Sequence, residues 1–185
     1  MGRFTFEETE IYGLYIIDPP VFEDTRGFFV ELFNGRDFRE AGLDVTFVQD
    51  NLSLSEKGVL RGLHLQASHP QGKLVRVLRG EVFDVVVDVR EDSPTFCRWK
   101  GTVLSGDNWR QVFIPPGLAH GFLVLSDEAE FLYKCTDFYY PEDERGILWN
   151  DPDLAIEWPL IGGRTPLLSE KDTAWGTLRE FIRDN

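Results

Sequence analysis

Short runs of β-branched and aromatic residues, each followed by Gly, Pro, Asn or Asp, constrain the fold of this chain more than any other feature. Six such runs are evident, at residues 28–33, 74–78, 82–89, 111–114, 122–125 and 131–139. These residue types favour a pleated, half-buried backbone, and the residues between the runs favour turns. The spacing therefore predicts an all-β fold, an antiparallel sandwich or barrel.

The run at 82–89 also predicts how its side chains divide. A period of two places Asp84 and Asp88 on one face and four apolar residues on the other, namely Phe83, Val85, Val87 and Val89. We expect one face in the core and two carboxylates on the other. Arg79 and Gly80 predict a tight turn before this run, so that residues 74–89 would form a hairpin.

Helical patterns are few and short. One is expected at about 36–41, and a tail helix is indicated by the spacing of Trp175, Leu178, Phe181 and Ile182. Ser169 and Asp172 resemble a capping box at the start of this tail. The chain has no internal repeat or long linker, so we expect a single domain over residues 1–185, with a C-terminal segment of about 160–185 packed against it.

Charge and composition exclude several classes of partner. The 185 residues include 32 acidic and 19 basic ones, a net charge of -13, which opposes binding to nucleic acid or an anionic membrane surface. No apolar stretch is long enough to span a bilayer. Cys97 and Cys135 have no metal-ligand spacing and are expected as two core thiols. The N-terminus lacks a signal-peptide pattern, so the expected location is the cytoplasm.

GxGxxG, GxSxG, HExxH and phosphate-loop motifs are absent from the sequence.

Two of the histidines bear on whether the protein binds a metal ion. The PxGxxH pattern that ends at His120 resembles the second motif of the cupin jelly rolls. The first cupin motif normally supplies an HxH pair and a Glu, whereas this chain has His64-Leu65-Gln66. A metal ion would keep only about two nitrogen ligands, too few for a closed or catalytic site. We therefore expect a jelly roll without metal.

Several longer motifs, in order along nearly the whole chain, resemble the dTDP-4-dehydrorhamnose 3,5-epimerase family. They are GVLRGLHLQ at 58–66, QGKLV at 71–75, the segment 115–122, YKCT at 133–136, LWNDPD at 148–153 and SEKD at 169–172. The resemblance implies a cupin-like jelly roll with short peripheral helices and no cofactor or metal. It also implies a homodimer with strand exchange near the N-terminus. Such an enzyme inverts C3 and C5 of dTDP-4-dehydro-6-deoxy-D-glucose on the way to dTDP-L-rhamnose.

The chemistry of this reaction requires three kinds of group. Inverting a carbon next to a ketone needs a base for the α-proton, donors for the enolate oxygen, and an acid that returns a proton from the other side. His64 is the natural base, because an imidazole titrates near neutral pH and a carboxylate behind it would fix its tautomer. The resemblance assigns that carboxylate to Asp172. It makes Tyr133 the acid opposite His64, and Lys73 the group that stabilises the enolate.

The remaining substrate contacts also follow from the resemblance. It gives Arg61 and His120 a share in holding the enolate oxygen. It assigns further substrate binding to Arg26, Glu31, Gln49, Asp50, Asn51, Tyr139, Glu144 and Lys171. Arg61 and His64 are three residues apart, so an ideal strand would point them to opposite faces. Gly62 between them permits a bulge that would bring both to one pocket.

Other interpretations stay open from the residues alone. His64 is also typical of a hydrogen-bonded interior histidine, and Asp172 of a helix cap. Tyr133 fits an ordinary sheet aromatic, and Lys73 a strand-edge charge. The alternatives to a double epimerase are a single-carbon epimerase of a related dTDP-4-keto-6-deoxy sugar, a non-catalytic jelly-roll sugar binder, and a metal-dependent cupin enzyme. Cys97 stands where the resembled family usually has Gly, which predicts a different local turn.

Overall fold

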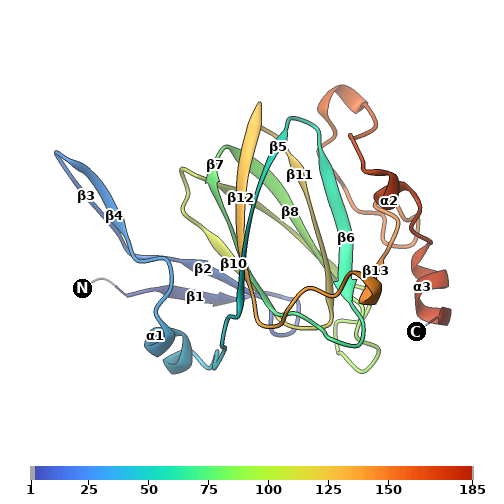
Figure 1. The fold of residues 1–185 in the computed structure, drawn as a ribbon, viewed down its shortest axis with the longest axis horizontal. Helices are drawn as coiled ribbons and strands as arrows, with labels where there is room; N and C mark the ends of the chain where they lie inside the picture. Colours follow the sequence, from blue (N-terminus) through green and yellow to red (C-terminus); the bar gives the residue numbers. More distant parts are fainter. Residues whose placement is uncertain (1–2, 185) are drawn as a thin grey trace.

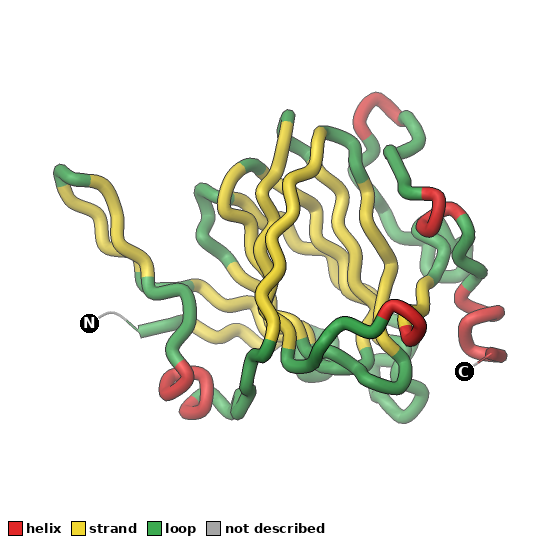
Figure 2. Tube along the Cα trace, viewed as in Figure 1, coloured by secondary structure: helices red, strands yellow, loops and turns green. Residues whose placement is uncertain are grey.

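Two antiparallel sheets face each other and form the body of the protein (Figures 1 and 2). The computed structural model describes residues 3–184, so Met1, Gly2 and Asn185, at the ends of the predicted domain and tail, lie outside the described residues. The first sheet has the order β1 (Thr5–Glu8), β2 (Tyr15–Asp18), β10 (Gln111–Ile114), β7 (Lys73–Arg79), β12 (Glu128–Cys135) and β5 (Gln49–Glu56). The second has the order β13 (Glu144–Gly146), β6 (Leu60–Gln66), β11 (Leu118–Val124), β8 (Glu81–Asp88) and β9 (Trp99–Ser105). This arrangement confirms the predicted all-β jelly roll.

The six predicted strands all exist, five of them with shifted ends. β10 has the predicted bounds, whereas the run at 131–139 ends early, at Cys135 of β12, and the run at 28–33 is β4 (Gly27–Val30). None of the predicted runs corresponds to β5. In this strand the polar side chains face inward and the apolar ones face outward, the reverse of the usual pattern. Its inner face carries Gln49, Asn51, Ser53 and Ser55, and its outer face carries two exposed leucines, Leu52 and Leu54. A search for apolar inner faces therefore passes over this strand.

The predicted hairpin at 74–89 is wrong. β7 belongs to the six-stranded sheet and β8 to the five-stranded sheet, so the turn at Gly80 carries the chain from one sheet to the other. The expectation of one core face on β8 is also wrong. Val82 and Val86 join the core between the sheets, while Val85 and Val87 join a second core. Both faces of β8 are covered, so its two carboxylates are buried rather than exposed.

Three apolar clusters hold these layers together. The largest lies between the two sheets and includes Val75, Leu104 and Phe131. The second lies where the C-terminal segment covers the outer face of the five-stranded sheet, and there Leu178 is buried. The third lies under α1 (Gly35–Glu40), whose Phe38 is fully buried. Burial of such a side chain contributes roughly 1.5–3 kcal/mol relative to its exposure.

The tail contains two helices instead of the single one predicted. α2 (Glu170–Thr173) begins at the cap residue Ser169, and α3 (Leu178–Asp184) follows after residues 174–177. The predicted cap is confirmed, because Ser169 Oγ accepts the backbone N–H of Asp172 at 3.2 Å. The carboxylate of Asp172 receives the Ser169 hydroxyl at 2.8 Å instead of reaching back to the backbone. Within residues 3–184 no helix is long and apolar enough to span a membrane.

One hairpin lies outside the two sheets. The strands β3 (Val21–Asp24) and β4 pair only with each other, and the hairpin projects away from both sheets (Figure 1).

The two cysteines differ in burial. Cys135 is buried as expected, but Cys97 is only half-buried, and both thiols are free. Cys97 has a φ of 62°, in the left-handed region that favours glycine. This conformation explains why a glycine is the easier residue at this position.

Candidate active site

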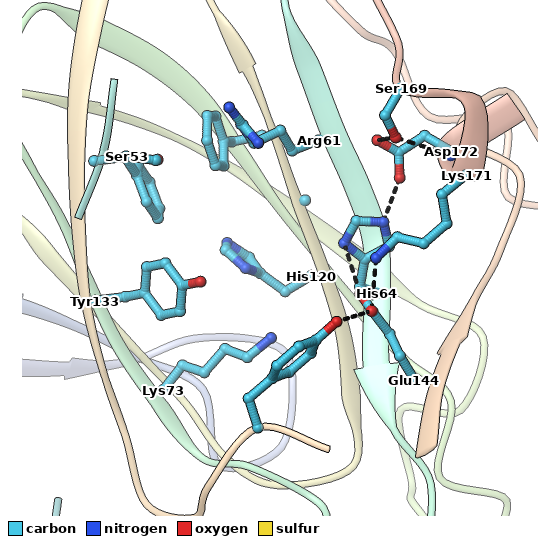
Figure 3. Close-up of a pocket in the computed structure, with 14 residues that line it drawn as sticks. Ser53, Arg61, His64, Lys73, His120, Tyr133, Glu144, Ser169, Lys171 and Asp172 are labelled. Carbon is cyan, nitrogen blue, oxygen red and sulfur yellow. Dashed lines mark hydrogen bonds and ion pairs between the residues drawn. The ribbon is translucent and has the colours of Figure 1, made fainter. Parts of the chain in front are cut away.

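A cavity of about 510 Å³ opens between the two sheets and gathers most of the predicted functional residues (Figure 3). Its size is within the range of small-molecule sites. Nine of the predicted residues line it: Arg61, His64, Lys73, His120, Tyr133, Tyr139, Glu144, Lys171 and Asp172. They come from strands of both sheets and from the tail. The jelly roll therefore brings together residues that are far apart in sequence.

A bulge in β6 lets Arg61 and His64 reach the same cavity, as predicted. His64 pairs with His120 of β11 and Arg61 pairs with Phe122, so the register shifts between the two positions. Gly62, with a φ of 130°, lies at this shift. A Cβ atom there would lie 2.9 Å from the carbonyl oxygen of His120, closer than real Cβ atoms come. Glycine is therefore required for the bulge that delivers both side chains.

The imidazole of His64 is held by the tail. Its Nε2 is hydrogen-bonded to Oδ1 of Asp172, the carboxylate that also accepts the Ser169 hydroxyl. Burial favours the neutral acid, but the bonds from His64 and Ser169 outweigh it and lower the pKa of Asp172. The carboxylate therefore stays ionised, and as an acceptor it selects the imidazole tautomer with the proton on Nε2. Nδ1 is left as the basic nitrogen, on the side of the ring that faces the cavity (Figure 3).

A second carboxylate, Glu144, lies at the mouth of the cavity. Its Oε1 is 3.6 Å from Nδ1 of His64, and its Oε2 accepts hydrogen bonds from Lys171 at 2.6 Å and Tyr139 at 2.7 Å. Burial raises the pKa of Glu144, but the Lys171 and Tyr139 bonds outweigh it, so the pKa lies below its usual value. The bond to Glu144 in turn raises the pKa of Tyr139 to about 12. This cluster provides one cation and one phenol at the entrance.

His120 lies deeper, on the floor of the cavity. Its Nε2 is 2.7 Å from Oδ2 of Asp84, and both side chains are buried. Its ring stacks on Phe131, with ring centres 6.0 Å apart, and Phe131 stacks on Phe122 at 4.2 Å. Packing on these rings and the bond to Asp84 fix the imidazole in place.

Lys73 and Tyr133 come from the six-stranded sheet and face the two histidines (Figure 3). Burial lowers the pKa of the Lys73 amine, an effect opposed by the negative charges of Glu144 and Asp84 and by the Cys135 thiol. Burial also raises the pKa of the Tyr133 phenol, so it is protonated at neutral pH. Tyr133 lies on the wall opposite His64. The cavity therefore has an imidazole on one side, a phenolic proton on the other, and the Lys73 amine between them.

Five predicted residues do not line this cavity. Arg26 lies in the turn of the projecting hairpin and pairs with Asp24 at 2.5 Å. Glu31 follows β4 and accepts a hydrogen bond from Asn34. Asp50 lies on the outer face of β5, where it pairs with Lys134.

The other two, Gln49 and Asn51, are on the inner face of β5. Gln49 donates to Asn51 and accepts the backbone N–H of Tyr139, so this pair adjoins the rim of the cavity.

The structure also adds residues that the sequence did not single out. Asp84, the partner of His120, was expected only as one of two carboxylates on a strand face. Ser53 lines the cavity, and Ser55 accepts a 3.1 Å hydrogen bond from Nε of Arg61. For Ser53 and Ser55 the sequence offered one signal, the polar residues at every second position of β5, which point to one face of the strand.

Among residues 3–184, no group of three or more His, Cys, Asp or Glu side chains has an arrangement that would hold a metal ion.

Comparison with known proteins connects this geometry to a family. The family model described as dTDP-4-dehydrorhamnose 3,5-epimerase matches residues 8–180. The enzyme of that name from Methanothermobacter thermautotrophicus is 55% identical over 180 residues, which cover 97% of each chain. That from Pseudomonas aeruginosa is 61% identical over 163 residues, covering 88% of this chain and 89% of the other.

Solved structures agree with this match. The dTDP-6-deoxy-D-glucose-3,5-epimerase of Legionella pneumophila, solved in complex with dTDP-4-keto-L-rhamnose, superposes with a TM-score of 0.94 at 52% identity, covering 98% of this chain and 96% of that one. A 3'-monoepimerase from Streptomyces bikiniensis, in complex with dTDP-quinovose, has a TM-score of 0.89 at 38% identity, with coverages of 95% and 88%. By sequence match over most of its length and by fold, this chain is a member of the dTDP-4-dehydrorhamnose 3,5-epimerase family.

Proposed function

We propose that the protein inverts C3 and C5 of dTDP-4-dehydro-6-deoxy-D-glucose and yields dTDP-4-dehydro-L-rhamnose, in dTDP-L-rhamnose biosynthesis. The observation that most strongly supports this function is the arrangement of the cavity. His64 and Asp172 lie on one wall, Tyr133 lies on the opposite wall, and Lys73 and His120 lie between them. A base and an acid on opposite sides of a bound sugar ring suit the inversion of a carbon. The family membership supports the same substrate class.

The first step is removal of the proton next to the C4 ketone. Because Asp172 accepts the Nε2 proton of His64, the Nδ1 lone pair is the base, and Asp172 stabilises the imidazolium that forms. The electrons of the broken C–H bond move onto the ketone oxygen and give an enolate. A positioned base of this kind contributes roughly 10²–10⁴-fold to the rate.

The enolate oxygen needs donors that are already in place. Lys73 supplies a positive charge, Arg61 a guanidinium held by Ser55, and His120 an imidazole fixed by Asp84. Charge developing on the substrate is stabilised strongly by such preorganised groups in an enclosed cavity. Tyr133, protonated at neutral pH, then donates its proton to the carbon from the opposite face, and the ketone re-forms. Water then takes the proton from His64 and returns one to the Tyr133 phenolate, so that a second cycle at the other α-carbon completes the double inversion.

The entrance of the cavity fits a nucleotide. Lys171 offers a cation for a diphosphate, and Tyr139 offers an aromatic ring for the base. A net charge of -13 makes such local cations necessary for an anionic ligand. Gln49 and Asn51, adjoining the rim, extend this polar surface.

Incubation with the 4-keto sugar nucleotide in heavy water, followed by NMR, tests the function. Deuterium at both C3 and C5 is expected. Label at one carbon only would establish the alternative, a single-carbon epimerase like the 3'-monoepimerase relative. Retention of the nucleotide without any label would establish a binding protein instead. Elemental analysis and activity after exhaustive chelation test the expectation that no metal is needed.

We also propose that two copies of the chain assemble with exchange of the hairpin β3–β4. Arg26 lies on that projecting hairpin, outside the cavity of its own chain. The outer face of the six-stranded sheet exposes Leu52 and Leu54. A second copy would cover the exposed leucines of this face.

Sedimentation equilibrium of the wild type and of Leu52→Glu tests this assembly. A dimer that the substitution dissociates is expected, and a monomeric wild type would refute it. The cytoplasmic location stays a prediction, which cell fractionation would test.

A further inference from the structure

Trp175 lies directly behind the catalytic imidazole. It belongs to the connection between α2 and α3, which runs beside β13 and β6 (Figure 1). Its ring is edge-on to that of His64, with centroids 6.0 Å apart and an interplanar angle of 63°. Gly146 of β13 is the register partner of His64, and the indole occupies the space where a side chain of residue 146 would be. A Cβ atom at Gly146 would lie 2.6 Å from Nε1 of the indole.

The connection that carries Trp175 is tied to the LWNDPD motif, whose purpose the proposed function leaves unexplained. The backbone N–H of Leu148 donates to the carbonyl of Gly176 at 2.8 Å. The N–H of Leu178 donates to Oδ2 of Asp151 at 2.9 Å, and Asp151 is 1% exposed. These bonds hold the residues that follow Trp175 against the end of β13. The same motif therefore fixes the place of the indole.

The indole acts by its shape and not by a hydrogen bond. Its Nε1 is buried and has no hydrogen-bond partner among the residues that the structure describes. A buried N–H without an acceptor destabilises a fold, so any stabilising contribution of the indole comes from the packing of its ring. The ring next to it is that of His64, which is hydrogen-bonded to Asp172 at Nε2 and whose Nδ1 lies 3.6 Å from Oε1 of Glu144.

We infer that Trp175 is a positioning residue for His64, held in place by Gly146 and Asp151. The inference rests on the proposed function, in which Nδ1 of His64 removes the proton. One hydrogen bond fixes one end of an imidazole but leaves its plane free to turn about that bond. The indole edge blocks this turn on one side, and a misplacement of about 1 Å at a reacting group can cost roughly a hundredfold in rate.

Steady-state kinetics of two substitutions at this residue test the inference. Trp175→Ala is expected to lower kcat about 10- to 100-fold with KM changed less than about threefold, because the ring plane of His64 is lost but the binding groups stay. Trp175→Phe keeps an aromatic edge and removes the N–H without an acceptor, so it is expected to restore kcat to within about fivefold of wild type. Trp158→Phe is the matched control, since Trp158 is a buried tryptophan in the apolar cluster under the C-terminal segment and its Nε1 donates to the Trp149 carbonyl. It is expected to lower the melting temperature but to leave kcat unchanged.

A double-mutant cycle with Gly146→Ala separates positioning from general loosening. Gly146→Ala alone should displace the indole and lower kcat, whereas in the Trp175→Ala background it should have no further effect on kcat. Additive effects, or a folded Trp175→Ala with wild-type kcat, would overturn the inference. If Trp175→Ala does not fold, Gly146→Ala and Trp175→Phe carry the test. A wild type that takes up no deuterium would instead refute the proposed function.

Discussion

The cavity contains two histidine–carboxylate pairs that are built in different ways. His64 and Asp172 are 108 residues apart, and they join a strand of the sheet to the tail. His120 and Asp84 lie on neighbouring strands, β11 and β8, in the middle of one sheet. The side chain of His64 is 21% exposed and that of His120 is 8% exposed.

This difference suits two kinds of chemistry. A base has to meet the substrate and exchange protons with it, which requires access and a free ring nitrogen. A donor to an enolate has to be fixed before the charge develops, which the rigid middle of a sheet provides. We therefore expect activity to depend most on the first pair and stability most on the second.

Alanine substitution at the two histidines gives the largest expected effect. His64→Ala should lower deuterium uptake by about a thousandfold or more, the upper range for a general base, while nucleotide binding survives. His120→Ala should lower kcat about a hundredfold, as for one lost donor, but should destabilise the protein more, because Asp84 is left buried without its partner. Label uptake and urea unfolding of both variants measure this. Equal losses in both quantities for the two variants would remove the distinction.

Lys73→Met tests the group that lies between the pairs. We expect kcat to fall about a hundredfold, since one preorganised donor is lost. The free energy of unfolding should stay the same or rise, because burial lowers the pKa of Lys73 and so disfavours the charged amine in the folded state. Lys57→Met, at an exposed pair with Asp127, is the control and should change neither quantity. An undiminished kcat in Lys73→Met would exclude an enolate contact.

Asp88 is a third buried carboxylate, and it extends the comparison of the two pairs to stability in acid. Its substitution is expected to have the smallest effect of the changes considered. Burial raises its pKa, but hydrogen bonds from Arg90, Ser93 and Thr95 outweigh this and lower the pKa from 3.8 to about 2. A lowered pKa stabilises the fold above about pH 4, and this stabilisation, about 2 kcal/mol, is lost as the pH falls towards 2. Urea unfolding between pH 7 and 2.5 should show a shallower decline for Asp88→Asn. Parallel curves for wild type and variant would assign the acid sensitivity to other carboxylates.

Much of the fold could be predicted from the sequence, because apolar alternation and turn residues mark strands that have one core face. The pattern failed where a strand faces something else. β5 carries polar residues on its inner face, so the pattern missed it, and β8 is buried on both faces, so the prediction of a single core face was wrong. The turn at Gly80 is short enough for a hairpin, and only the packing of the sheets shows that it joins two layers instead.

The candidate site could also be predicted only in part. His64, Lys73 and Tyr133 could be proposed from motifs and from the needs of the reaction, and the bulge at Gly62 from an inconsistency in strand period. Asp84 could not be identified, because its pairing with His120 depends on the register of two strands. The distance of Arg26 from the cavity could not be predicted either, since it depends on the direction in which a hairpin leaves the sheet.

The inverted alternation of β5 has a practical consequence for protein engineering. The strand lies at the edge of its sheet and is held through its backbone to β12 alone, so its inner side chains contribute little to the packed core. Of the residues on its inner face, Ser53 lines the cavity, Gln49 and Asn51 adjoin its rim, and Ser55 holds Arg61. A library restricted to Gln49, Asn51 and Ser53 is expected to change which sugar nucleotides the protein accepts, while it leaves the proton-transfer groups and the Ser55–Arg61 bond intact.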